Sequence, residues 1–504
     1  MNIWNLHDFD ARSVAAEPLG TFAERAGRML VMSNRAPVRL VQEEGRERIE
    51  PTVGGVGATF VHLLERHGGL WIAWSGGQRG VPRVMMPRND PRFELMLMRL
   101  SERDISSYYY GMCNRALWPL MHFMTSNCRF DTAPWDSYRR VNRMFAETAS
   151  AEVSHFEVAW IQDFHLALVP GHLKRRHPDL PIGLFWHVPW PPEQVFRIFP
   201  WRKELLAGML GSDLIGFHTA SYVKHFLDCC ERILGCTVDR SSGTVRHGSH
   251  ETRVDKFPLG IPATYFQELS TSAAVRTHAR RIRRVLRTPT VILSVDRLDY
   301  TKGILERLLA FERFLESNPR YRRQVTLVLI AVPSRTKVAE YAALKRRLDE
   351  LVGRVVGRFS SEGWVPIRYL YTQFSAAELV SYYQVSDIAL VTPLRDGMNL
   401  IAKEYIASQV SDSSVLILSE FAGAAHELAD ALLVNPYDID QMAERIKQAI
   451  EMPLEERRQR FSRMRDQVTS KNIDYWSDSF LATLLATFPE GRSLAAHSTS
   501  CASV

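Results

Sequence analysis

Short apolar runs rich in β-branched and aromatic residues recur along the chain and alternate with longer segments of helical period. In the first half of the chain the predicted strands are residues 29–33, 71–75, 158–162, 182–186 and 214–217. Strands that are apolar on both faces and separated by helices form parallel sheets with helices on both sides. This alternation predicts an α/β fold built from Rossmann-like, doubly wound sheets.

The strand pattern starts afresh in the second half of the chain, which indicates a second domain. Its predicted strands are residues 291–295, 325–332, 388–391 and 415–418. Between the two series, Gly260-Ile261-Pro262 interrupts regular structure. Single cores stop growing at roughly 250–300 residues, so a chain of 504 residues is expected to divide in two. We expect an N-terminal domain over 29–265 and a C-terminal domain over 266–473, facing each other across a cleft.

Composition and the chain ends exclude several classes of protein. The net charge of +7 is modest, and no block of Lys and Arg alternates with aromatics as in nucleic-acid binders. Six cysteines without a Cys-x-x-Cys pair indicate a reducing compartment. Residues 1–28, an expected N-terminal extension, lack the pattern of a secretory signal, and no apolar run reaches the ~20 residues of a membrane span. The small, polar residues 490–504 are expected to be a disordered tail. The sequence thus predicts a cytoplasmic protein with small-molecule substrates, and leaves a homo-oligomer open.

Polar residues follow the predicted strands of the first domain. Doubly wound sheets bind ligands at the carboxyl ends of their strands. Arg35 follows the first strand, and Gly54 and Gly55 precede a helix, where backbone amides can approach an anion. Asp163 ends the third strand, and His187 ends the fourth. An equally good interpretation of Asp163 is that it caps the following helix. An equally good interpretation of His165 is that it is a histidine of the apolar core.

Two cations follow the first strand of the second domain. Arg297 and Lys302 lie five residues apart over a strand-to-helix turn, so both charges can converge on one point. Two cations at such a point would stabilise the departure of a diphosphate without a metal. The alternative is that they form ion pairs with Asp296 and Asp299.

The most specific motif is Arg395-Asp-Gly-Met-Asn-Leu-Ile-Ala-Lys-Glu404, which follows the strand at 388–391. Backbone amides near Gly397 would lie at a helix N-terminus, ready for an anion. Asp396 could accept hydrogen bonds from sugar hydroxyls, and Glu404 from paired ribose hydroxyls. The alternative for Glu404 is an exposed helix residue without a ligand.

Seven motifs occur in a recognisable order between about residues 29 and 476. They are Ser-Asn-Arg, Gly-Gly, Leu-Trp-Pro, Asp-Phe-His, His-Val-Pro-Trp-Pro, Asp-Arg-Leu-Asp-Tyr-Thr-Lys-Gly and the motif that ends at Glu404. This set resembles the trehalose-6-phosphate synthases, retaining glycosyltransferases of family 20. The resemblance implies a GT-B fold with a C-terminal helix, 474–489, that crosses back to the first domain. It also implies transfer of glucose from UDP-glucose to glucose 6-phosphate with retention, giving α,α-trehalose 6-phosphate and UDP.

The resemblance also assigns roles to individual residues. The implied catalytic residues are His187, Arg297, Lys302 and Asp163. The implied binding residues for the sugar donor are Gly54, Gly55, Phe374, Asp396, Gly397, Met398, Asn399, Leu400 and Glu404. The implied binding residues for the acceptor are Arg35, Tyr109, Trp118, Asp163 and Arg335. No Asp-x-Asp motif stands at a strand end, so neither a metal nor another cofactor is expected.

Three alternatives stay open at this point. Residues 121–135 also resemble the glucosylglycerol-phosphate synthases, which would make glycerol 3-phosphate the acceptor and ADP-glucose the sugar donor. A non-catalytic regulatory homologue is a second alternative, although the cleft charges are all present. A nucleotide-sugar hydrolase or a phosphorylase on the same fold is a third, although no lysine motif of a pyridoxal-type phosphorylase is found. A separate phosphatase is expected to dephosphorylate the product.

Overall fold

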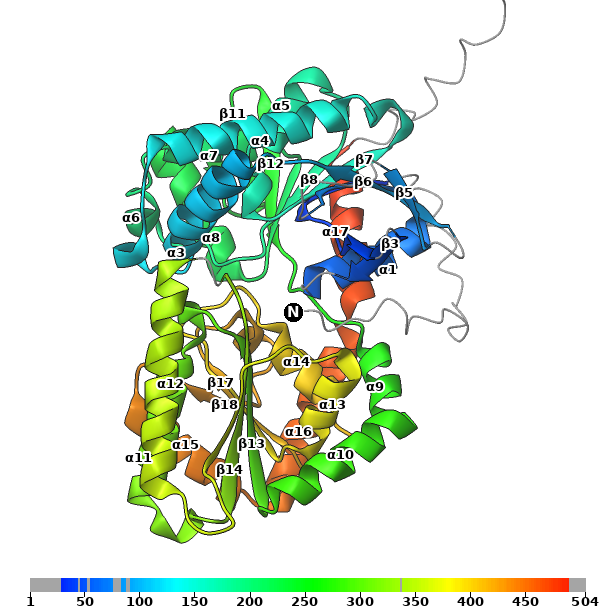
Figure 1. The fold of residues 1–504 in the computed structure, drawn as a ribbon. Helices are drawn as coiled ribbons and strands as arrows, with labels where there is room; N and C mark the ends of the chain where they lie inside the picture. Colours follow the sequence, from blue (N-terminus) through cyan, green and yellow to red (C-terminus); the bar gives the residue numbers. More distant parts are fainter. Residues whose placement is uncertain are drawn as a thin grey trace, which may run out of the picture. The chain divides into compact units, whose positions relative to one another are not determined.

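The computed structural model describes residues 29–43, 46–51, 55–75, 83–87, 91–335 and 338–488. The expected N-terminal extension, the expected tail and Gly54 lie outside these residues. The chain forms two compact units, drawn in Figure 1. The N-terminal unit is built around Phe60–Phe257 and the C-terminal unit around Pro258–Trp476.

The N-terminal unit contains a sheet with the strand order β10-β11-β12-β9-β8-β7-β1-β4-β6-β5. Its central strands are parallel: β1 (Met29–Arg35), β4 (Gly69–Trp74), β6 (Phe93–Met98), β7 (Val158–Gln162), β8 (Ile182–Phe185), β9 (Leu214–Phe217) and β12 (His250–Lys256). Antiparallel strands flank them: β5 (Arg83–Met86), β10 (Thr237–Asp239) and β11 (Thr244–His247). A separate pair is β2 (Val38–Glu43) with β3 (Arg46–Pro51). All five strands predicted in this half are confirmed.

Helices cover both faces of this sheet (Figure 1). They are α1 (Gly55–His67), α2 (Glu102–Asp104), α3 (Trp118–Met121), α4 (Thr132–Ser150), α5 (Val169–Arg176), α6 (Glu193–Phe196), α7 (Arg202–Met209) and α8 (Ala220–Cys229). π-Helical segments span Ile105–Leu117 and Cys230–Leu234. Helix α4 begins at Thr132, and Pro134 is tolerated because it lies in the first turn.

The C-terminal unit contains a parallel sheet with the order β15-β14-β13-β16-β17-β18. Its strands are β13 (Thr290–Arg297), β14 (Val325–Val332), β15 (Ile367–Leu370), β16 (Ile388–Val391), β17 (Val415–Ser419) and β18 (Leu432–Val434). The four strands predicted in this half are confirmed. Strand β14 is buried over its whole length, as a central strand covered on both faces must be.

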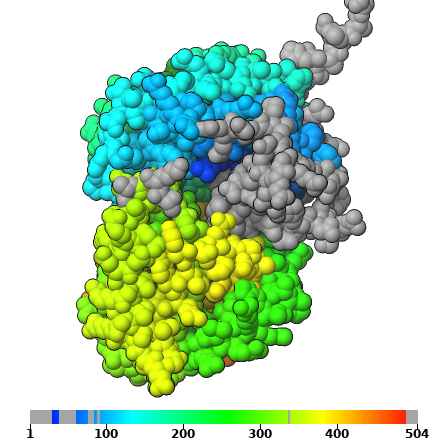
Figure 2. Space-filling model, in the orientation of Figure 1, coloured from blue at the N-terminus to red at the C-terminus, as the bar shows by residue number. Residues whose placement is uncertain are grey.

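Two apolar cores lie on the two faces of this sheet. One face is covered by α11 (Ile304–Ser317), α12 (Ala339–Phe359) and α15 (Ile439–Glu451). The other is covered by α9 (Ala263–Thr271), α10 (Ala273–Leu286), α13 (Ala376–Val385), α14 (Leu400–Ala407) and α16 (Leu454–Ser470). In Figure 2, α12 in yellow-green and α10 in green form part of the outer surface of this unit.

The last helix, α17 (Ile473–Ala486), contains the point at which the chain returns to the N-terminal unit, between Trp476 and Ser477. Beyond that point, Phe480 is fully buried and its ring stacks on Trp160 of β7, with centroids 4.5 Å apart and planes 4° apart. Phe480 also packs against Phe185 and Phe257. The core of the N-terminal unit is therefore completed by the last helix of the chain.

No described helix is long and apolar enough to cross a bilayer.

We predict that Phe480→Ala destabilises the N-terminal unit by about 3–5 kcal/mol, because it leaves a cavity beside Trp160. Urea unfolding followed by tryptophan fluorescence measures the change. Tyr475→Ala on the same helix is the control, because Tyr475 is 50% exposed and its loss should change the free energy of unfolding by less than about 0.5 kcal/mol. Equal effects of the two substitutions would contradict the prediction.

Candidate active site

The turn after β13 gathers charged side chains at the carboxyl end of the sheet of the C-terminal unit. Arg297 is the last residue of β13, and a short 3-10 turn, Tyr300–Lys302, leads into α11. The Asp299 carboxylate accepts hydrogen bonds from the backbone N–H and the hydroxyl of Thr301, both at 3.0 Å. Gly303 has a φ of 63°, and a Cβ there would lie 2.4 Å from the carbonyl oxygen of Thr392. The turn therefore requires glycine directly after Lys302.

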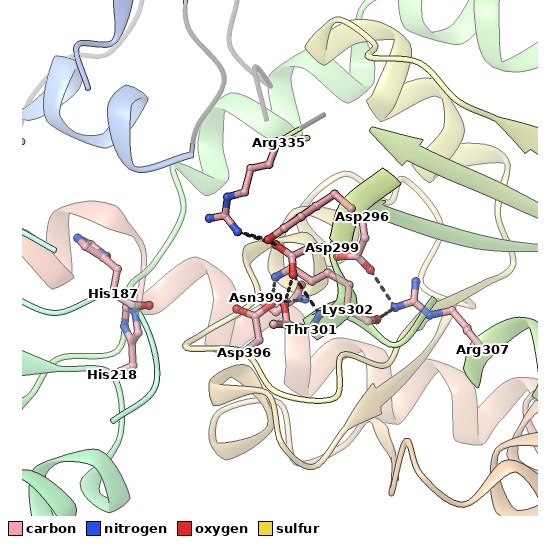
Figure 3. Close-up of polar contacts among 11 residues, drawn as sticks. His187, His218, Asp296, Asp299, Thr301, Lys302, Arg307, Arg335, Asp396 and Asn399 are labelled. Carbon is pink, nitrogen blue, oxygen red and sulfur yellow. Dashed lines mark hydrogen bonds and ion pairs between the residues drawn. The ribbon is translucent and has the colours of Figure 1, made fainter. Parts of the chain in front are cut away.

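Lys302 and Asp396 bring the two most specific motifs together (Figure 3). Lys302 Nζ, almost fully buried, donates to Asp396 Oδ2. Asn399 Nδ2 donates to the same oxygen at 3.0 Å. The lysine predicted to bind a diphosphate therefore lies beside the carboxylate predicted to bind a sugar.

Asp299 is buried against a second cation, Arg335. Arg335 Nη1 donates to Asp299 Oδ2 at 3.0 Å and also to the hydroxyl of Tyr341, which itself donates to Asp299 Oδ2 at 2.9 Å. Burial alone would raise the pKa of Asp299, but the charges of Arg335, Arg297 and Lys302 hold it at about 2. Asp299 therefore stays ionised and orients the Arg335 guanidinium.

Arg307 is a site residue that the sequence analysis missed. It is only 1% exposed, and its guanidinium donates to Asp296 Oδ2 at 2.8 Å and to the backbone carbonyl of Lys302 at 2.7 Å. It also donates to the hydroxyls of Ser294 and Thr392. Arg307 therefore joins the ends of β13 and β16 to the turn that carries Lys302 (Figure 3).

The sequence did hold a signal for Arg307. It lies on the same helical stripe as the buried residues Ile304, Leu308 and Phe311, where an unpaired charge is almost never found. Arg297 and Lys302, the alternative partners of Asp296 and Asp299, act on these carboxylates electrostatically: Lys302 acts on both, and Arg297 acts on Asp299. The hydrogen-bonded cations are Arg307 for Asp296 and Arg335 for Asp299. Burial raises the pKa of Asp296, and the charges of Arg307 and Lys302 oppose that rise.

The loop before α14 adopts an unusual backbone conformation, which contacts with a neighbouring loop hold in place. Asn399 has a φ of 70°, which is sparsely populated for a residue with a side chain. A Cβ on Gly423 would lie 2.0 Å from the carbonyl oxygen of Gly397, so the two loops meet at a glycine. Ala424 N–H donates to the Met398 carbonyl at 2.8 Å. Leu400 is the first residue of α14, so the predicted helix N-terminus lies where the motif indicated.

Glu404 is buried within α14, with 2% of its surface exposed. The alternative of an exposed helix residue is therefore wrong. Burial raises its pKa to about 7, although Tyr383 donates a hydrogen bond to Oε2 at 2.9 Å, which lowers it. Phe374 lies half-buried between β15 and α13, with its ring 5.0 Å from that of Tyr382.

In the N-terminal unit, Arg35 and Tyr109 come together at the end of β1. The Arg35 guanidinium lies 4.7 Å from the ring centroid of Tyr109 and 5.2 Å from that of Trp74, which is cation–π geometry. Tyr109 also stacks on His165 at 6.2 Å. Two residues predicted to bind the acceptor are thus neighbours, although 74 positions separate them in the sequence.

Asp163 and His187 form a second polar group in this unit. Asp163 has a φ of 69°, and its Oδ1 accepts from the backbone N–H of His187 at 3.2 Å. It makes no side-chain cap for the following turn, so the capping alternative is wrong. Trp118 is buried with its ring 6.1 Å from that of Phe164, the residue after Asp163. Gly55 begins α1, where only its backbone is described.

His187 is half-buried, and desolvation lowers its pKa well below the usual value, as do His218 and His165. His187 Nε2 lies 2.9 Å from Gln162 Oε1, and His218 Nε2 lies 3.1 Å from the His187 carbonyl oxygen. Figure 3 shows the two histidines. His187 is therefore a neutral imidazole in a defined orientation.

Within the described part of the chain, no three His, Cys, Asp or Glu side chains are grouped as a metal site would need.

The sequence pattern of glycosyltransferase family 20 matches residues 27–486. This chain belongs to glycosyltransferase family 20. It is 38% identical to the trehalose-6-phosphate synthase of Mycolicibacterium vanbaalenii, over 91% of this chain and 96% of that protein. It is equally similar, at 38%, to the bifunctional trehalose-6-phosphate synthase/phosphatase of Thermoproteus tenax, but spans only 64% of that protein's length.

A solved structure of the family has the same fold. It is an α,α-trehalose-phosphate synthase (UDP-forming) from Burkholderia xenovorans in complex with glucose-6-phosphate. The comparison of this chain with that structure gives a TM-score of 0.83 and a sequence identity of 34%. It covers 91% of this chain and 100% of that chain. Together with the two parallel-core sheets, this likeness confirms the predicted GT-B fold class.

We predict that Arg307→Met lowers the free energy of unfolding of this family 20 protein by about 3–5 kcal/mol, because Asp296 is left as a buried charge without its partner. Chemical denaturation measures the loss. The double variant Asp296→Asn with Arg307→Met should recover most of it, because no charge is then buried. A double variant no more stable than the single one would show that charge burial is not the cause.

Proposed function

We propose that this chain transfers glucose from UDP-glucose to glucose 6-phosphate with retention, forming α,α-trehalose 6-phosphate and UDP. The observation that carries the proposal is the convergence of Lys302, Asp396 and Asn399 at the carboxyl end of the C-terminal sheet. A cation, a carboxylate and a helix N-terminus in one place suit a sugar linked to a diphosphate. The relatives named as trehalose-6-phosphate synthases support the choice of substrates.

The C-terminal unit supplies the proposed site for the sugar donor. Arg297 and Lys302 bind the diphosphate, and Lys302 exchanges its contact with Asp396 for a phosphate oxygen. The loop from Asp396 to Leu400 offers backbone amides and a carboxylate to the glucose. Glu404, in its ionised form, accepts hydrogen bonds from the ribose hydroxyls. Phe374 and the Gly54-Gly55 pair complete the proposed set.

The proposed acceptor residues are Arg35, Tyr109, Trp118, Asp163 and Arg335. Arg35 offers a planar grip on the phosphate of glucose 6-phosphate, and Tyr109 beneath it holds the guanidinium in place. Arg335, kept in one orientation by Asp299, offers a second guanidinium. The aromatic rings suit the apolar faces of a sugar ring.

The proposed reaction is a front-face substitution at the anomeric carbon. The bond from that carbon to the diphosphate oxygen breaks, while the acceptor hydroxyl forms a new bond on the same face. The departing phosphate oxygen takes the hydroxyl proton. Arg297 and Lys302 stabilise the charge that develops on UDP, and such a contact is typically worth about 3–4 kcal/mol. We propose that no metal is required and that the reaction takes place in the cytoplasm.

The deciding experiment incubates the purified protein with UDP-glucose and EDTA, with glucose 6-phosphate or glycerol 3-phosphate in separate reactions. We expect a phosphorylated disaccharide with glucose 6-phosphate alone, identified by mass spectrometry and by its retained anomeric configuration. If a product forms with glycerol 3-phosphate alone, the proposed acceptor is wrong and the chain has the activity of a glucosylglycerol-phosphate synthase. Turnover with neither acceptor would support a regulatory homologue.

We predict that Lys302→Met lowers kcat by about 10²–10³, because one stabilising contact to the leaving diphosphate is lost. Steady-state rates of UDP release measure the effect. Lys224→Met is the control, since Lys224 forms only a surface pair with Asp228 on α8. Equal rates for the Lys302 variant and the wild-type protein would contradict its role.

We predict that UDP-glucose binds about tenfold more weakly at pH 6 than at pH 8, because only ionised Glu404 accepts the ribose hydroxyls and its pKa is about 7. Isothermal titration calorimetry measures the Kd. In Glu404→Gln the pH dependence should disappear. The effect on stability has the opposite sign: the raised pKa of this carboxyl stabilises the fold below about pH 4.5, and this contribution is lost as the pH rises through 7. A wild-type Kd that is flat from pH 6 to 8 would rule out titration of Glu404.

A further inference from the structure

Gln162 is the last residue of β7 and is fully buried beside the His187 imidazole. Its side-chain oxygen lies 2.9 Å from His187 Nε2. An amide oxygen can only accept a hydrogen bond, so the proton of a neutral imidazole at this contact must be on Nε2. The lone pair of the ring is then on Nδ1.

Two further contacts hold the backbone of His187 in place. Asp163 Oδ1 accepts from the backbone N–H of His187, and His218 Nε2 contacts its backbone carbonyl. The titratable groups that face the imidazole are His218 and His165, with Asp163 bound to the backbone. Neither histidine offers a negative charge that would favour an imidazolium.

The Gln162 amide nitrogen gives independent evidence that this side chain does more than fill space in the core. It is buried and has no hydrogen-bond partner among the residues that the structure describes. A buried donor without a partner is destabilising, and an apolar residue of the same shape would avoid this. The contact between Gln162 Oε1 and His187 therefore comes at a cost in stability, which indicates a role in the site.

We propose that Gln162 is a positioning residue that fixes His187 as the neutral Nε2–H tautomer, so that Nδ1 accepts a hydrogen bond from a substrate hydroxyl. This inference rests on the proposed function, together with the catalytic role that the family resemblance implies for His187. A neutral amide suits this task better than a carboxylate, because a carboxylate at the same place would favour the imidazolium. The imidazolium has no lone pair to offer.

Nitrogen-15 NMR of the full chain with labelled histidine tests the tautomer directly, with His187→Asn used to assign the signal. We expect the His187 signals of the Nε2–H form in the wild-type protein. In Gln162→Met, which keeps the shape and removes the acceptor, we expect a mixture of tautomers. If His187 of the wild-type protein is in the Nδ1–H form, the proposal is wrong. This result does not depend on which substrates the protein uses.

Kinetics against pH test the consequence for catalysis. In Gln162→Met we expect kcat to fall about tenfold with the KM for UDP-glucose little changed. In Gln162→Glu we expect the acidic limb of the kcat profile to move up by about one pH unit or more, because the new carboxylate stabilises the imidazolium. A limb that does not move would overturn the proposal, since a purely structural role predicts no shift.

The matched control is Gln384→Met on α13, which also removes a glutamine hydrogen bond, in this case to the Ser270 carbonyl. We expect its pH profile to equal that of the wild-type protein. If the wild-type protein turns over neither acceptor, the proposed function fails. The NMR experiment still decides the Gln162 proposal in that case, so the two failures can be told apart.

Discussion

Buried charge at the end of β13 is the constraint on which the C-terminal site depends. Asp296 and Asp299 lie in the interior, where a carboxylate is stable only beside a cation. Arg307 pairs with the first and Arg335 with the second. Because Arg307 also binds the Lys302 carbonyl, the pairing that stabilises the fold also sets the position of the lysine.

The N-terminal unit uses the opposite electrostatic arrangement. Its histidine at the end of β8 is kept neutral by burial and by two other histidines, and it contacts an amide rather than a carboxylate. The charge it presents, Arg35, is supported by aromatic faces instead of an acid. One unit thus compensates its buried carboxylates with ion pairs, and the other offers an oriented imidazole and a guanidinium supported by aromatic rings.

Much of this site could be anticipated from residue order, because strand ends are easy to find in buried β-branched runs and ligands bind at strand ends. The approach of Lys302 to Asp396 follows from two neighbouring strands, β13 and β16, that both end there. Arg307 was not predicted because the buried face of a helix usually contains apolar residues. Gln162 was not predicted because the residues next to it in the sequence carried the more specific motif. The ion pairs of Asp296 with Arg307 and of Asp299 with Arg335 could not be predicted, because they depend on proximity in space and not in sequence.

The sequence by itself determined the two doubly wound units, nine of their strands and the family, since apolar periodicity and long motifs are local properties. Only the tertiary structure decided which cation binds which carboxylate. Lys302 and Asp396 are 94 positions apart, and Arg335 and Asp299 are 36 apart. It also decided the charge states, because the pKa values of Glu404 and His187 are shifted chiefly by burial, and burial exists only once distant segments have packed together.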